Sequence, residues 1–229
     1  MASQSSHGKD ISMKNRKLLL PTMLLLSLIP LKASVIYNSF GSPPPGYAFF
    51  SGWAIGKFAQ FDSQLELAVP FTPTADYLLD TITIAAHLHS ASPYDQLTMY
   101  LAAGATTPGP AIESFTFTLS VPSLLTAISS SRPALASGAQ YWVVLTAPDL
   151  AHTSGGWLIS SPSVPGIYAG RNLTTSSNWN FSSGNFALPA LEVTGTSTPE
   201  PSAWVLLGSG IIGFFLTRRC YASRKLGSD

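Results

Sequence analysis

Cysteine and charge are both scarce in this chain of 229 residues. Its one cysteine, Cys220, stands close to the C-terminus, so no intramolecular disulfide can form. Charged residues make up 10% of the sequence, against about 25% in an average soluble domain. Hydrophobic residues nevertheless reach 45%, which excludes a disordered chain. Ser, Thr, Gly and Pro fill the remainder and favour an extracellular β-rich protein with many turns.

Basic residues are nearly absent from the middle of the chain. Residues 34–198 hold three bases and eight acids, which gives that stretch a net charge of −5. No basic stripe exists there to neutralise phosphates, so we expect no nucleic-acid partner. The remaining bases lie at the two ends of the sequence, mostly beside hydrophobic runs, as membrane-orientation signals do.

Sequence patterns of catalysis are also missing from the middle of the chain. It has no G-x-S-x-G elbow and no cysteine that can act as a nucleophile, and its acids are scattered. We therefore expect no catalytic residues, no cofactor and no enzymatic activity. An extracellular hydrolase with no recognisable motif remains an alternative.

Two histidines form the one pattern that suggests a metal. His87 and His89 are two positions apart, so on a strand they point to the same face and can share an ion. Zinc needs further ligands, and the nearby sequence adds only Asp95. The pattern favours a polar sheet face over a metal site.

The N-terminal residues 1–33 have the parts of a secretory signal peptide. A basic cluster at residues 14–17 precedes an apolar run at residues 18–29, and Ala33 supplies the small residue of a cleavage site. The residues before this cluster are dispensable for such a signal, which makes Met13 a candidate start. The alternative is an uncleaved N-terminal anchor.

The C-terminal part holds a second apolar run. We expect a linker at residues 195–202, a transmembrane helix at 203–217 and a basic cytoplasmic tail at 218–229. The run of fourteen residues from 203 to 216 is short, because a stable span needs about 20. Arg218 and Arg219 follow it as a stop-transfer signal.

Residues 198–220 resemble the PEP-CTERM sorting signal in the order of their parts. Pro199, Glu200 and Pro201 come first, then the apolar run, then Arg218 and Arg219. The resemblance implies a protein exported by a Gram-negative bacterium, with the helix as a transient inner-membrane anchor. It also implies cleavage near Pro-Glu-Pro by an exosortase, for which the three motif residues are substrate. The expected destination is the cell envelope, outer surface or extracellular matrix.

The body, residues 34–194, alternates apolar and polar residues with a period of two. Runs of this kind occur at residues 35–40, 65–71, 81–88, 96–103, 113–119, 141–146, 157–161 and 187–193. Gly- and Pro-rich turns separate them, and residues 122–129 are the one helical candidate. These features predict an all-β, jelly-roll-like β-sandwich flanked by an N-terminal signal helix and a C-terminal apolar helix.

The body is similar to a choice-of-anchor extracellular domain, most closely to the type called R. The resemblance rests on VIYNSFG at residues 35–41, GWAIG at 52–56, AVPFTP at 68–73, LDTI at 79–82, PAIESF at 110–115 and GAQYWV at 138–143. It implies a surface domain that occurs joined to alternative anchors, and it implies no activity.

These features predict a non-catalytic surface or matrix protein with a structural or adhesive role. The alternative is an exopolysaccharide-binding module, because Trp157 and Trp179 stand among loop residues where exposed rings can stack on sugars. The expected partners are an exosortase, the membrane through the C-terminal helix and, for the alternative, exopolysaccharide.

Overall fold

The computed structural model describes residues 33–41, 46–58, 63–89, 95–118, 123–161 and 163–198. The predicted signal helix and the predicted C-terminal helix fall outside the described residues. In the part of the chain that is described, no helix is long and apolar enough to cross a membrane.

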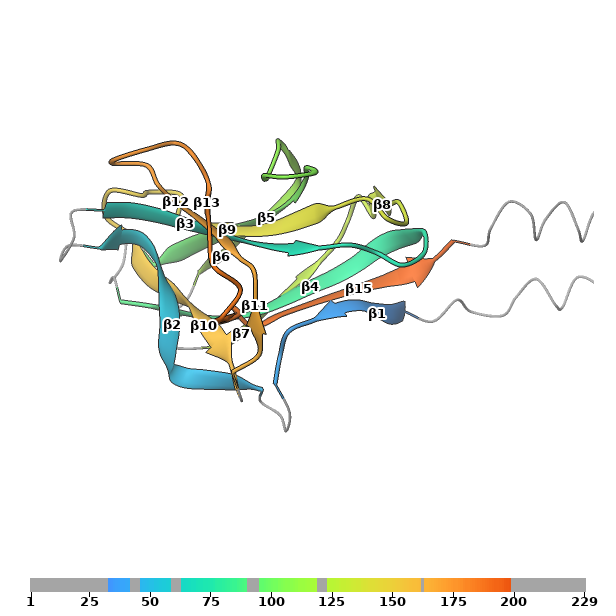
Figure 1. Cartoon of the computed structure of the whole chain (residues 1–229), viewed down its shortest axis with the longest axis horizontal. Coiled ribbons are helices and arrows are strands. Elements are labelled where there is room, and N and C mark those ends of the chain that lie inside the picture. The colour runs from blue at the N-terminus through green and yellow to red at the C-terminus, as the bar shows by residue number, and fades with distance from the viewer. Residues whose placement is uncertain are drawn as a thin grey trace, which may run out of the picture. The chain divides into compact units, whose positions relative to one another are not determined.

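The described residues form an all-β, sandwich-like body (Figure 1). Nearly every strand belongs to one 13-stranded sheet, and β11 and β14 form a separate pair. The strands are β1 (Ala33–Asn38), β2 (Tyr47–Phe58), β3 (Ser63–Phe71), β4 (Tyr77–Leu88), β5 (Gln96–Ala103), β6 (Ala111–Thr118), β7 (Ser123–Ile128), β8 (Ala134–Leu135), β9 (Tyr141–Thr146), β10 (Ser154–Ser160), β11 (Pro165–Gly166), β12 (Ala169–Asn172), β13 (Asn180–Phe181), β14 (Phe186–Ala187) and β15 (Leu191–Ser197).

The long sheet folds over itself into two layers. One layer contains β1, β15, β4 and β7, and the other contains β12, β3, β9, β5 and β6. Strand β2 links them, because its first part pairs with β10 and its last part with β3. The change of partner occurs at Gly56, where φ is 75° and an added Cβ would lie 2.1 Å from the Thr153 carbonyl oxygen. Only glycine fits this bend without strain.

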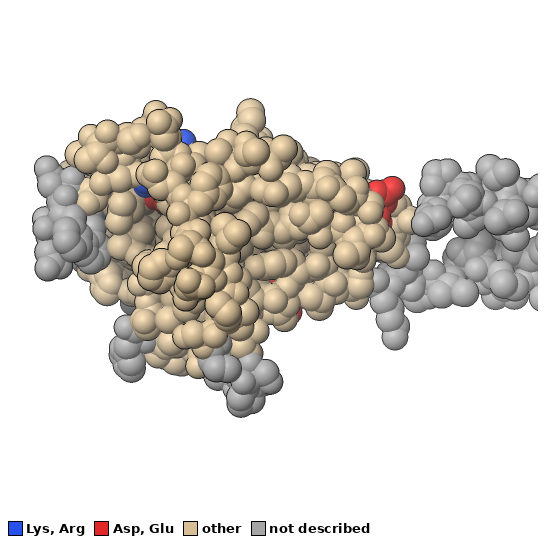
Figure 2. Space-filling model, viewed as in Figure 1, with Lys and Arg blue, Asp and Glu red and all other residues tan. Residues whose placement is uncertain are grey.

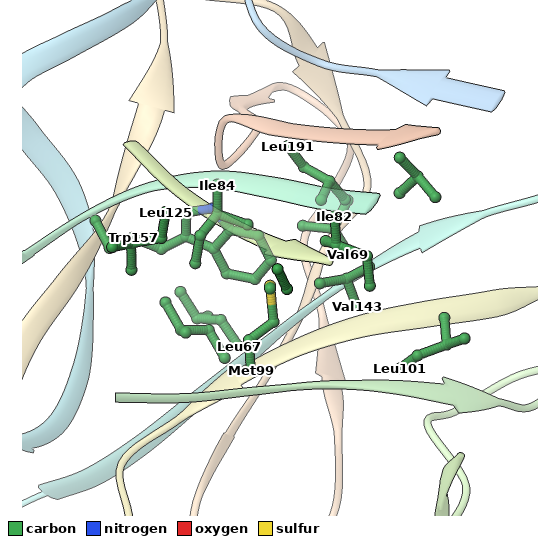
Figure 3. Packing of buried hydrophobic residues seen from close by; sticks show 14 of the residues in the cluster. Leu67, Val69, Ile82, Ile84, Met99, Leu101, Leu125, Val143, Trp157 and Leu191 are labelled. Carbon is green, nitrogen blue, oxygen red and sulfur yellow. The ribbon is translucent and has the colours of Figure 1, made fainter. Parts of the chain in front are cut away.

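The core lies between the two layers (Figure 3). Ile82 and Ile84 of β4 and Leu191 of β15 face Val69 of β3 and Val143 of β9. This arrangement follows from the pleat, which sends alternate residues of a strand to opposite faces. The sandwich-like all-β architecture that the alternation predicts is therefore confirmed.

A second, smaller apolar cluster lies on the outer side of the second layer. It consists of Ala68, Ala102, Trp142, Val144 and Ala169, with Tyr100 and Trp179 packed against it. This cluster explains why both faces of β9 are apolar, with five of its six residues buried. Strand β12 pairs with β3 and contributes to this cover.

Three sequence-based expectations need correction or completion. The helix expected at residues 122–129 is wrong, because residues 123–128 form β7, with Leu125 and Ala127 buried and Leu124 and Ile128 exposed. That period of two is a strand pattern. The linker expected to begin at residue 195 begins later, because β15 continues to Ser197. Strand β2 was not among the predicted runs.

Candidate functional site

Trp157 is a core residue and does not line a surface site. Its side chain is 0% exposed, and its indole N–H donates to the Ala190 carbonyl oxygen at 2.9 Å. Figure 3 shows the ring among Ile84 and Leu125. The expectation that Trp157 is exposed is therefore wrong. The glycines before it, Gly155 and Gly156, belong to β10 and pass close to His87 of β4, so they mark close strand packing and not a loop.

Trp179 is half-buried and packs over a partly buried ion pair. Arg171 of β12 stands opposite Glu66 of β3 in the strand register, and its Nε–H donates to the Glu66 carboxylate. The guanidinium carbon lies 4.5 Å from the centre of the Trp179 ring, in cation–π range. The Trp179 side chain is half-buried, so its ring is only partly available to a ligand.

Both oxygens of the Glu66 carboxylate accept a hydrogen bond. Besides Arg171, it accepts a hydrogen bond from the Thr146 hydroxyl at 2.5 Å. Burial raises the pKa of the neighbouring Tyr100, the negative charge of Glu66 adds to this, and Arg171 opposes it. A buried carboxylate is tolerated when it is paired and hydrogen-bonded, as here. The cluster therefore fixes β12 on the sheet and orients Trp179.

An exposed aromatic side chain extends this face of the body. Phe181 of β13 is half exposed, and its ring centre lies 6.1 Å from that of Trp142. We call Arg171, Trp179 and Phe181 the aromatic face. Aromatic rings beside a fixed guanidinium provide the apolar and polar contacts that a sugar ring needs. Figure 2 shows that the view of the body shared with Figure 1 has few charged side chains.

His87 and His89 come together as their spacing predicts. Their Nε2 atoms are 2.7 Å apart, and burial, with a smaller contribution from His89, lowers the pKa of His87. The His87 Nδ1 atom is buried without a hydrogen-bond partner among the described residues, which favours the tautomer of neutral His87 that carries its proton on Nε2 and donates it to His89. A metal bound to both Nε2 atoms would displace this proton onto the buried Nδ1.

The described residues thus favour a hydrogen-bonded histidine pair. Ligating histidines normally donate their second N–H to a carboxylate or carbonyl, and the described part of the chain offers His87 no such acceptor. No group of three or more His, Cys, Asp or Glu side chains that can hold a metal occurs within the described ranges.

The C-terminal end of the body is held by a polar cluster. The Arg132 guanidinium donates to Asp80 at 2.6 Å and to the Thr196 hydroxyl at 3.0 Å, and that hydroxyl donates to Asp80 at 2.6 Å. Beyond β15, the Thr198 N–H donates to the Asp76 carbonyl oxygen at 2.9 Å. The fold therefore holds the chain up to the residue before Pro199.

Sequence reasoning did not find the Glu66–Arg171 pair. The two residues are 105 positions apart, and only the antiparallel pairing of β3 and β12 brings them together. Glu66 carried one signal, since it is the one charged residue of β3 and stands between Leu65 and Leu67. A charge in that position calls for a partner.

Comparison with known proteins identifies the sorting segment. Residues 197–219 match the family model described as the PEP-CTERM protein-sorting motif. No curated protein matches the chain. The matched range includes Pro199, Glu200, Pro201, Arg218 and Arg219, which all follow Thr198, the last described residue. The chain thus carries a PEP-CTERM sorting motif, which marks it as an exported protein of the cell envelope or surface that is sorted by an exosortase.

Proposed function

We propose that the protein has a non-catalytic, structural or adhesive role at the cell surface or in the extracellular matrix. In this proposal the body is a jelly-roll-like domain of the choice-of-anchor type. The segment at residues 203–217 anchors it transiently in the inner membrane until the exosortase cleaves near Pro199. The observation that carries the proposal is the sorting motif at residues 197–219, which begins at the final residue of the last strand of the body.

Deletion of residues 199–229 tests the sorting step. The truncated protein should lose processing and surface display, because the matched motif is removed almost entirely. A matched control lacks only residues 220–229, which lie beyond the motif, and should be processed normally. Cell fractionation and intact-mass analysis of the surface protein provide the readout. Normal processing and display of the longer deletion would refute the sorting mechanism.

Exopolysaccharide binding is the second candidate function, and the aromatic face supports it. The Trp179 ring is oriented by Arg171, and Phe181 lies exposed on the adjoining strand. Affinity electrophoresis of the exported protein in gels that contain the host's exopolysaccharide measures such binding. Retardation should occur for the wild type and be lost in Trp179→Ala. Phe186→Ala is the control, because Phe186 is an aromatic residue as exposed as Phe181 but packs against Trp53, away from the aromatic face. No retardation of the wild type would count against binding.

A further inference from the structure

Strand β7 is an edge strand of the first layer. It pairs antiparallel with β4, with Thr126 opposite Thr83 and Ile128 opposite Thr81. Among the described residues it pairs with no other strand. One side of its backbone therefore has no strand partner within the described ranges.

One hydrogen bond shows which backbone groups of β7 point away from β4. The Ser129 N–H donates to the Asp80 carbonyl oxygen at 2.8 Å, so this pair, next in register after Ile128 and Thr81, is hydrogen-bonded. In an antiparallel ladder, bonded and non-bonded pairs alternate. The N–H and C=O groups of Leu124, Thr126 and Ile128 consequently point to the free edge.

The side chains of the same three residues lie on the outer face of the sheet. Leu124 is 49% exposed and Ile128 is 76% exposed, and the Thr126 hydroxyl bonds the Thr83 hydroxyl at 3.0 Å. Leu125 and Ala127, which alternate with them, are buried and fix the inner face of β7 in the core. The free edge is therefore rigidly presented and partly apolar.

The edge lacks the features that usually prevent strands from pairing between molecules. Natural edge strands are protected by lysine, proline, bulges or inward-pointing charges. Residues 123–128, with the sequence SLLTAI, contain neither charge nor proline, and the β4–β7 register has no bulge. The edge strand of the other layer, β6, does carry a charge, Glu113, which accepts hydrogen bonds from Ser129 and Ser130.

We propose that β7 is a self-association edge that pairs antiparallel with β7 of a second copy of this chain. A two-fold axis at Thr126 places each Leu124 opposite Ile128 of the second copy and the two Thr126 residues opposite each other. All outward backbone groups then find partners, in about six hydrogen bonds. The row of threonines formed by Thr83 and Thr126 continues into the second molecule. The first layer of one molecule and the first layer of the other then form one continuous sheet.

A second copy fits this edge because the strand is complementary to itself. Apolar side chains meet apolar ones, hydroxyls meet hydroxyls, and no like charges meet across the axis. Isologous pairing of this kind closes as a dimer. The inference deepens the proposed structural role and rests on it, since it names another molecule of the same protein as the partner on the surface.

Cysteine cross-linking in cells tests the register. The full chain with Cys220→Ser is produced in its host, and Thr126→Cys, Leu124→Cys or Thr116→Cys is added. Thr116 is the matched control, because it is an exposed threonine of β6 that pairs with Thr98 across the sheet as Thr126 does with Thr83. After mild oxidation, Thr126→Cys should give a disulfide-linked dimer on non-reducing gels. The Leu124→Cys and Thr116→Cys variants should remain monomers.

A heterologous pair extends the test. Leu124→Cys co-expressed with Ile128→Cys should cross-link, because these positions face each other across the axis, whereas Leu124→Cys alone does not. Equal cross-linking of Thr126→Cys and Leu124→Cys, or no dimer with Thr126→Cys, would overturn the proposal. Surface delivery is scored in the same cells, so absence of the dimer with normal delivery refutes the edge pairing and leaves the sorting intact.

Light scattering on the purified exported protein gives an independent readout. Thr126→Lys places two lysines opposite each other at the axis and should weaken dimerisation roughly fivefold. Thr116→Lys, with the same substitution on β6, should leave the dimer unchanged. A wild type that stays monomeric at high protein concentration, or equal effects of both lysines, would overturn the proposal.

Discussion

Replacement of Trp157 by phenylalanine separates a core role from a surface role. The indole is 0% exposed, and its N–H donates to Ala190. Loss of that hydrogen bond costs about 1 kcal/mol. The smaller ring leaves a void among the core side chains, at about 1–2 kcal/mol for a partial truncation. The Ala190 carbonyl oxygen retains the N–H of Ala85 at 3.3 Å, so it adds no further cost. We expect a total loss of about 2–3 kcal/mol.

Urea unfolding of the exported protein measures this loss. With a slope of about 2 kcal/mol per molar urea, the midpoint should fall by about 1–1.5 M without a change of slope. Trp179→Phe is the matched control, because that ring is half-buried and should cost under about 1 kcal/mol. A midpoint for Trp157→Phe at or above that of Trp179→Phe would refute the assignment of Trp157 to the core.

Two further predictions concern charged groups of the body. Glu66→Gln should destabilise the fold by about 3 kcal/mol, because it leaves Arg171 without its carboxylate, and the double variant with Arg171→Met should recover most of this loss in urea unfolding. A double variant as unstable as the sum of both singles would contradict the ion pair. The lowered pKa of His87 means that the unfolded chain binds a proton more readily than the folded one, so stability should be fully present above about pH 6.5 and fall below it. In His87→Gln the stability difference between pH 7.5 and pH 5.5 should shrink, and an unchanged difference would show that His87 does not cause it.

The strand pattern was predictable wherever one face of a strand is buried and the other exposed. Strand β5 has the bounds expected from its alternation, because Leu97, Met99 and Leu101 face the core while Thr98 and Tyr100 between them do not. Residues 123–128 were expected to be helical, since the adjacent leucines and the alanine match a helical preference as well as a strand. The pairing with β4 decides the outcome, which is a tertiary effect that a local pattern does not contain.

The exposure of single aromatic residues was less predictable. Two glycines before Trp157 suggest a loop, but in β10 they allow the close approach of β4, where an added Cβ at Gly156 would lie 2.5 Å from His87 Cε1. Trp179 is half-buried against the second apolar cluster, and its orientation depends on Arg171 and thus on Glu66, far away in sequence. The residues that build the aromatic face were therefore only partly visible in the sequence.

The short connection between β15 and Pro199 limits how an exosortase can reach the sorting motif. Strand β15 lies between β1 and β4, and Thr196 is paired with Ala33 on one side and Leu78 on the other. Ala33 and the last residues before the sorting motif are therefore neighbours at one end of the body. Thr198 alone separates β15 from Pro199. Residues of β15 can therefore extend toward a protease only if the strand loses its hydrogen bonds to both β1 and β4. An exosortase that cleaves near Pro199 then either works against the surface of the folded body or acts before β15 has docked.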